Sequence, residues 1–142
     1  MGAFSDYLED KILGWMRGSA FPSAPATVYV GLLTAAPGDT GSGGSPSDGT
    51  EVSGGSYARV AITTTTGWNA IATSGTTRHM TNNGAVNFPT PTASWGTVVA
   101  VGIWDAASGG NLLFWTAISP TQTISSGNTV SIASGALDLS VD

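Results

Sequence analysis

The chain has 142 residues, no cysteine, a net charge of −5 and only 9% charged residues. This length suits one domain with its own hydrophobic core, so residues 1–142 are expected to form a single domain. The absence of cysteine excludes disulfides, thiolate metal sites and a cysteine nucleophile. The positive residues are Lys11, Arg17, Arg59 and Arg78. They form no basic stripe for a phosphate backbone, so nucleic acid is not an expected partner.

The N-terminal segment does not resemble a secretory signal. It carries Asp6, Glu9 and Asp10 where a signal peptide would carry positive charge. No apolar run in the sequence approaches the roughly 18 residues that a membrane span needs. We therefore expect a protein that is made and used without secretion or membrane insertion, and no membrane partner.

The first predicted element is an α-helix over residues 3–18, "FSDYLEDKILGWMRG" with its flanks. Its apolar residues recur every three or four positions and form one stripe: Phe4, Leu8, Ile12, Trp15 and Met16. Ser5 is the expected N-cap and Gly18 the expected stop. Because a helix this short is marginal alone, the stripe is expected to dock on something.

The remaining chain, residues 27–142, has the pattern of an antiparallel β-sandwich or jelly roll. A buried strand is predicted for "TVYVGLLT", and a long Gly/Ser-rich loop, flexible and exposed, over 35–56. The runs "GTVVAVGIW" and "NLLFWTAI" flank the turn "DAASGG", which predicts a hairpin of two central strands covered on both faces. Shorter strands are predicted in "SYARVAITTTT", "AVNF", "TQTI", "NTVSIA" and "ALDLSV".

A search for catalytic and cofactor motifs fails. The sequence contains no phosphate-binding loop, no nucleophile elbow and no zinc-protease motif. His79 is the single histidine, so one chain cannot build a triad or a multi-histidine metal site, and a loop or surface role is favoured. Asp105 starts the hairpin turn, where its side chain is expected to bond the backbone. We predict no enzyme activity and no cofactor.

Two further groups of residues have a binding interpretation and a structural one. Asp39, Asp48 and Glu51 lie in the long loop and together offer calcium ligands, but their spacing matches no EF-hand and a solvated loop is favoured. Trp104 and Trp115 flank the hairpin and are expected in the core or in a cross-strand pair, although exposed coplanar rings would make a carbohydrate platform.

Five segments, in order, resemble a family of small structural proteins of tailed bacteriophages that carry a tail-fibre-like label. They are "FSDYLEDKILGWMRG", "TVYVGLLTAAPGD", "YARVAIT", "NFPTPTASWGTVVAVGIWDAASGGNLLFWTAI" and "SGNTVSIASGALDLSVD". The resemblance covers nearly the whole chain. It implies a virion protein assembled in the host cytoplasm, and it supplies no catalytic residues.

Within a virion, two placements stay open. A short chain without repeats, with few charges and one docking helix, favours a capsid decoration or cement protein that binds the major capsid protein as a homotrimer. The alternative is a tail fibre or minor tail protein that adheres to a host-surface glycan. A free carbohydrate-binding module or a glycan-cleaving enzyme is the third possibility.

The candidate partner-binding residues are the helix stripe and Arg59. We expect the stripe, and not the Gly/Ser loop, to supply attachment contacts, because it is too apolar to face water. Arg59 is expected to pair with a carboxylate or with backbone carbonyls at a subunit contact, with an exposed arginine on an edge strand as the alternative.

Overall fold

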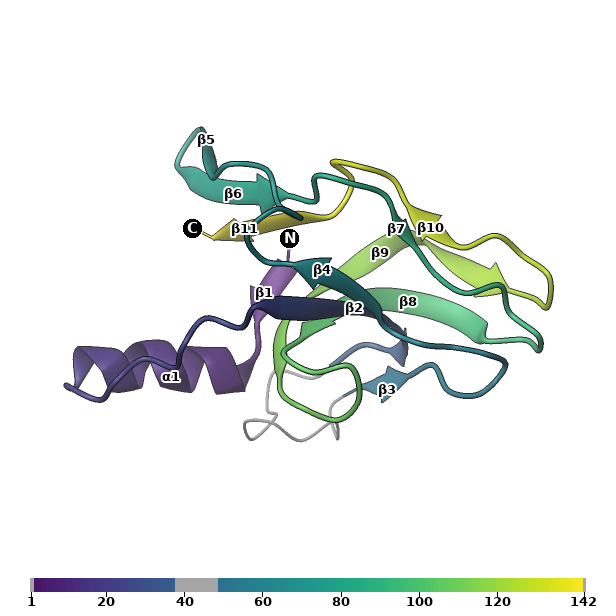
Figure 1. Ribbon diagram of the computed structural model, residues 1–142, viewed down its shortest axis with the longest axis horizontal. Helices are drawn as coiled ribbons and strands as arrows, with labels where there is room; N and C mark the ends of the chain where they lie inside the picture. The colour runs from purple at the N-terminus through teal and green to yellow at the C-terminus, as the bar shows by residue number, and fades with distance from the viewer. Residues whose placement is uncertain (1, 38–48, 142) are drawn as a thin grey trace.

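The structure is a computed structural model that describes residues 2–37 and 49–141. It is mainly β, with antiparallel strands and one helix that projects from them (Figure 1). The helix α1 spans Asp6–Met16. The strands are β1 Gly2–Phe4, β2 Thr27–Ala35, β3 Thr50–Glu51, β4 Val60–Thr63, β5 Ala72–Ser74, β6 Thr77–Thr81, β7 Val86–Asn87, β8 Gly96–Trp104, β9 Leu112–Ile124, β10 Ser131–Ile132 and β11 Asp138–Val141.

The largest sheet has the order β1-β9-β8-β2-β3, and β4 also pairs with β2. The predicted hairpin is confirmed as β8 and β9, joined by a turn in which the Asp105 carboxylate accepts hydrogen bonds from Asn111. Strand β8 lies between β2 and β9, and its residues from Ala100 to Trp104 are all buried. Strand β9 is different. Only Phe114 and Ile124 are buried along it, so the prediction that both hairpin strands are covered on two faces holds for β8 alone.

Two smaller sheets lie over one face of the large sheet (Figure 1). One has the order β11-β6-β5 and the other pairs β10 with β7. The core fills the space between, where Val30 and Ile103 of the large sheet join Val86 and Leu137 of the opposite layer in one buried cluster. The layers therefore form a sandwich. Its unequal sheets do not confirm the predicted jelly roll, which needs eight strands in two Greek keys.

The N-terminal segment differs from the predicted helix over 3–18. Phe4 belongs to β1, which pairs with β9, and its ring packs edge-on against Phe114 at 6.1 Å between centroids. The helix begins only at Asp6. The predicted N-cap is confirmed, because the Ser5 hydroxyl accepts a hydrogen bond from the Leu8 amide. A strand precedes the helix because β9 offers a free edge beside it.

The predicted flexible loop over 35–56 also needs correction. Residues 38–48 lie outside the described part of the chain. After them, Thr50 and Glu51 form β3 against β2, and Val52 is 5% exposed within the main core. The end of this segment is therefore part of the folded sandwich. The Gly/Ser-rich composition does not predict that Glu51 and Val52 are folded, because their partners come from distant strands.

A second, smaller apolar cluster lies on the other face of the large sheet, where Trp104 packs with Leu33 and Ala100. Trp104 lies over two paired glycines of adjacent strands, Gly31 and Gly102. A Cβ at Gly102 would lie 2.5 Å from the indole ring, and one at Gly31 would lie 2.7 Å from it. These positions are therefore glycine because the Trp104 ring occupies the space of their side chains.

Candidate partner-binding surface

The base of α1 is fixed to the sandwich. The Ser5 amide donates to the Leu113 carbonyl at 3.0 Å, and the Ser5 hydroxyl donates to the Leu112 carbonyl. Phe4 packs on the core beside it. These contacts set the direction in which the helix leaves β1, so the helix projects at one end of the sandwich (Figure 1).

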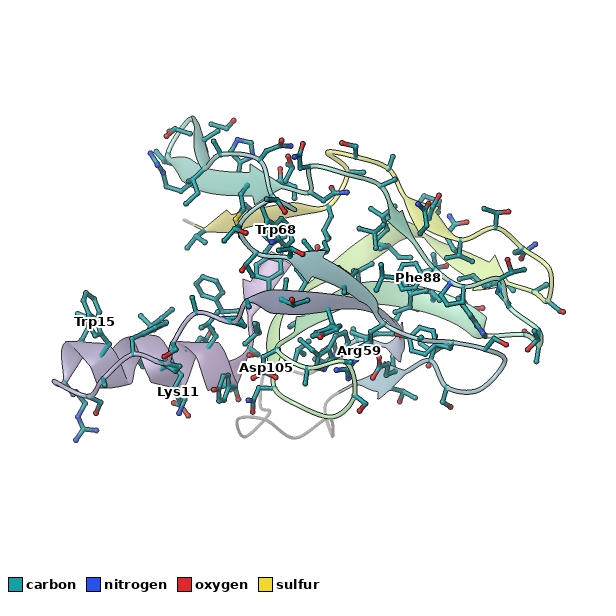
Figure 2. All side chains as sticks on the ribbon, in the orientation of Figure 1. Lys11, Trp15, Arg59, Trp68, Phe88 and Asp105 are labelled. Atoms are coloured by element: carbon teal, nitrogen blue, oxygen red, sulfur yellow. The ribbon has the colours of Figure 1, made fainter. Side chains whose placement is uncertain are left out.

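The far end of α1 is apolar and exposed. Leu13, Trp15 and Met16, which we call the helix tip, are 60%, 62% and 74% exposed. Figure 2 shows Trp15 at the end of the helix away from the β-layers. No residue of the helix is buried. Within its own chain the stripe therefore contacts the sandwich only at its base, through Phe4 and Leu8, and the expectation that it supplies attachment contacts stays a prediction.

The helix tip includes one residue that the stripe omitted. Leu13 follows Ile12 directly and lies five residues after Leu8, which does not fit the stripe, yet it is exposed together with Trp15 and Met16. The signal was present in the sequence. Four apolar residues among positions 12–16 cover more than one face, which a helix docked by a single stripe does not require.

An apolar pocket of about 710 Å³ opens at the base of α1. It lies where β1 and the start of the helix meet the segment before β5 and the β6–β11 ladder. Its apolar wall includes Phe4, Leu8, Trp68, Ile71, Phe114 and Val141. The sequence alone does not indicate this pocket, because its residues come from segments far apart along the chain.

Six large apolar side chains are exposed in the described residues. The helix tip and Phe21, in the connector after the helix, account for four of the six such side chains. The other two are Ile71 and Val141, which are 64% and 43% exposed and line the pocket. Because contiguous exposed apolar groups mark interaction sites, the helix tip and the pocket edge at Ile71 and Val141 are the candidate partner-binding surface.

Arg59 lies inside the fold, where its side chain is 4% exposed. Its guanidinium makes two hydrogen bonds of 2.7 Å to the Glu51 carboxylate and donates to the carbonyls of Ala106 and Gly109 at 2.7 and 2.8 Å. It also stacks on the Trp104 ring, 4.0 Å from the centroid. Figure 2 shows it beside the hairpin turn that begins at Asp105.

This placement corrects the predicted role of Arg59. The expected partners, a carboxylate and backbone carbonyls, are present, but they belong to the same chain. The exposed-edge alternative is also wrong, because the side chain is nearly completely buried. Arg59 therefore joins β3, β8 and the hairpin turn, and it offers almost no surface to a partner.

Tyr57 completes this cluster. Its hydroxyl donates to the Glu51 carboxylate at 2.9 Å and accepts from the Leu32 amide at 2.8 Å. Burial raises the pKa of Tyr57 well above its usual value, and the nearby Glu51 charge adds to the effect. The cluster is satisfied internally, so it is a structural network that fixes β3 on the large sheet.

The other candidate residues make local contacts in the described part of the chain. The Nδ1 atom of His79 lies 3.3 Å from the Oδ2 atom of Asp138 across the β6–β11 ladder, and the Asp138 side chain is half exposed. No group of three metal-ligating side chains occurs in residues 2–37 and 49–141. Asp39 and Asp48 lie outside these residues, while Glu51 is engaged by Arg59.

The tryptophans form no exposed platform in the described residues. Trp95 and Trp104 are 4% exposed, and Trp115 packs beside Trp104 in the smaller cluster, as the core interpretation predicted. Trp68 packs against the main core. Only Trp15 is largely exposed among them.

In the described part of the chain, α1 is neither long nor apolar enough to cross a membrane.

Comparison with known proteins gives one family. The model of the family described as "Podophage GP4 fiber I protein gp80" matches residues 3–140. The chain therefore belongs to this family, and the resemblance to virion structural proteins with a tail-fibre-like label is confirmed. No curated protein matches the chain.

Proposed function

We propose that this member of the phage fibre family is a fibre subunit that is held in the virion through its helix tip. The observation that carries the proposal is the exposure of Leu13, Trp15 and Met16 at the end of a helix anchored only at its base. The family description supports a fibre role. The proposal includes no catalytic step and no cofactor.

The energetics favour a contact at this place. Full burial of one large apolar side chain contributes about 1.5–3 kcal/mol, so three side chains that are each more than half exposed represent several kcal/mol. The base of the helix is fixed by the hydrogen bonds of Ser5, which hold the tip at a defined distance from the sandwich. A fixed apolar tip loses less conformational freedom on binding than a flexible one.

A capsid decoration protein that binds the major capsid protein is the second candidate. It is favoured by the sandwich that residues 2–37 and 49–141 form, in which no repeated unit occurs, since a fibre shaft is expected to show repeats. Copy number separates the two. Densitometry of purified virions would give a small number of subunits per particle for a fibre, and a number comparable to the major capsid protein for a decoration protein.

Rebinding to stripped virions tests the proposed role of the helix tip. Particles depleted of the protein would be incubated with the wild-type chain, with a Leu13→Ala/Trp15→Ala variant, or with Thr121→Ala. Thr121 is exposed on β9, away from α1, so the last variant is a matched control. We expect the double variant to lose occupancy and the control to retain it. Equal rebinding of both would refute the role of the tip.

A further inference from the structure

We propose that the helix tip of one subunit docks in the apolar pocket of a second copy of this chain. This inference rests on the proposed function, since it names the partner of the same tip. It follows from a match within one chain, which has an apolar projection at the end of α1 and an apolar pocket at its base.

The tip cannot fill the pocket of its own subunit. Leu8 lines the pocket, whereas Trp15 lies seven residues further along the same helix, about 10 Å away at 1.5 Å per residue. The helix points away from the sandwich over this distance (Figure 1). A second copy is therefore needed to bring a tip to a pocket.

The pocket has the size and lining to accept the tip. Its volume of about 710 Å³ falls within the roughly 300–1,000 Å³ of pockets that enclose a small molecule, which leaves room for more than one side chain. Phe114, which is buried, belongs both to the pocket wall and to the main core, so the pocket reaches the edge of the core. Ile71 and Val141 line the pocket and are exposed, so an incoming Trp15 would cover them too.

Charges beside the two surfaces are complementary. The first turn of α1 adjoins the pocket at Leu8 and carries Asp6 and Glu9, followed by Asp10. Arg17 follows the helix tip directly and would arrive at this acidic turn when the tip of a second copy docks. The two cationic or titratable residues in the pocket wall are engaged within their own chain, because Arg78 donates to Thr73 and His79 pairs with Asp138.

Each subunit would give one tip and receive one. Such a contact satisfies every subunit in a reciprocal pair or in a closed ring, and the predicted homotrimer is a ring of this kind. Light scattering of the purified protein gives the number of subunits. The inference requires only that the number exceeds one and that tip and pocket are both needed.

The first test compares a tip variant and a pocket variant. Trp15→Ala shortens the projection, and Ile71→Glu places a charge at the pocket; both positions are more than 60% exposed, so neither change disturbs the core. Sedimentation should show that each weakens self-association by about 30-fold or more, as loss of a central interface residue does. Thr121→Ala should associate like the wild-type protein. A monomeric wild-type protein, or oligomers unaffected by either variant, would overturn the inference.

The second test mixes the two variants. Trp15→Ala retains its pocket and Ile71→Glu retains its tip, so the pair should form a mixed complex although each alone is largely monomeric. No mixed complex would show that tip and pocket do not meet. The result also separates this inference from the proposed function. If the wild-type protein is monomeric yet the tip variant fails to rebind virions, then the tip binds a different virion protein.

Discussion

The buried ion pair between Glu51 and Arg59 makes a strong prediction about stability. Replacement of Glu51 by glutamine keeps the shape of the side chain and one hydrogen-bond acceptor, but it removes the negative charge. The Arg59 guanidinium, 4% exposed, then lacks its charged partner. Loss of one partner from a buried pair costs about 3–5 kcal/mol. Because Glu51 itself is 25% exposed, we expect the lower end, about 3 kcal/mol.

Replacement of both residues should cost less than the sum of the single changes. In a Glu51→Gln/Arg59→Met variant, no charge is left without a partner, and the methionine side chain still covers the Trp104 ring. The carbonyls of Ala106 and Gly109 lose their donor in Arg59→Met and in the double variant alike. Their effect therefore cancels from the interaction energy. We expect a favourable coupling of about 2 kcal/mol between Glu51 and Arg59.

Urea unfolding followed by tryptophan fluorescence measures these differences, with the four proteins of the cycle compared at one pH. In a parallel thermal unfolding experiment, Glu51→Gln should lower the melting temperature by about 10 °C, the shift that corresponds to about 3 kcal/mol in a domain of this size. The slope with urea should be unchanged. A cost below about 1 kcal/mol for Glu51→Gln would mean that the pair behaves as an exposed one, and the argument from burial would be wrong.

Three further predictions concern the packing and titration of the sandwich. Gly102→Ala should destabilise the fold by about 1–3 kcal/mol in thermal unfolding, because its Cβ would meet the Trp104 ring at 2.5 Å. Gly84→Ala is the control, because a Cβ at position 84 would have no neighbouring atom within 4 Å. Asn82→Asp should lower the free energy of unfolding in urea by about 2–4 kcal/mol, because the fully buried Asn82 amide donates to two backbone carbonyls and a carboxylate cannot donate. A cost near zero would contradict these hydrogen bonds. The raised pKa of Tyr57 predicts that stability is unaffected by this group up to about pH 10 and falls at higher pH, since the unfolded tyrosine ionises near 10 while the folded one stays protonated. Urea midpoints between pH 8 and pH 11 measure this fall, and Tyr57→Phe should reduce it; an equal fall in both proteins would assign it to other groups.

The elements that were predictable from sequence depend on contacts between residues close along the chain. The Ser5 cap and the β8–β9 hairpin belong to this class, because a side chain or a turn specifies each within a few positions. The sequence predicts Phe4 in the helix, because its spacing from Leu8 fits an α-helix. The free edge of β9, more than a hundred residues away, decides instead that Phe4 is in a strand.

The binding surface and the internal cluster show the same limit. Trp15 and Met16 were predicted as partner-binding residues from the helix alone, and their exposure agrees with that prediction without testing it. The pocket could not be predicted, because it depends on how the β6–β11 ladder lies over β1. The buried position of Arg59 could not be predicted for a related reason. Its partner Glu51 lies at the end of a Gly/Ser-rich segment that has no strand pattern of its own.

The scarcity of charge, by itself, is weaker support for subunit contacts than the sequence suggested. Along β9 the exposed positions include Ser119, Thr121 and Thr123, so hydroxyl side chains keep much of the surface polar without charge. Large exposed apolar groups of the described residues are instead confined to the helix tip with Phe21 and to Ile71 and Val141. A contact between these places would be mainly apolar, with Arg17 as a minor electrostatic contribution. Assembly should therefore persist when salt is raised, because salt screens the charges and leaves apolar burial intact.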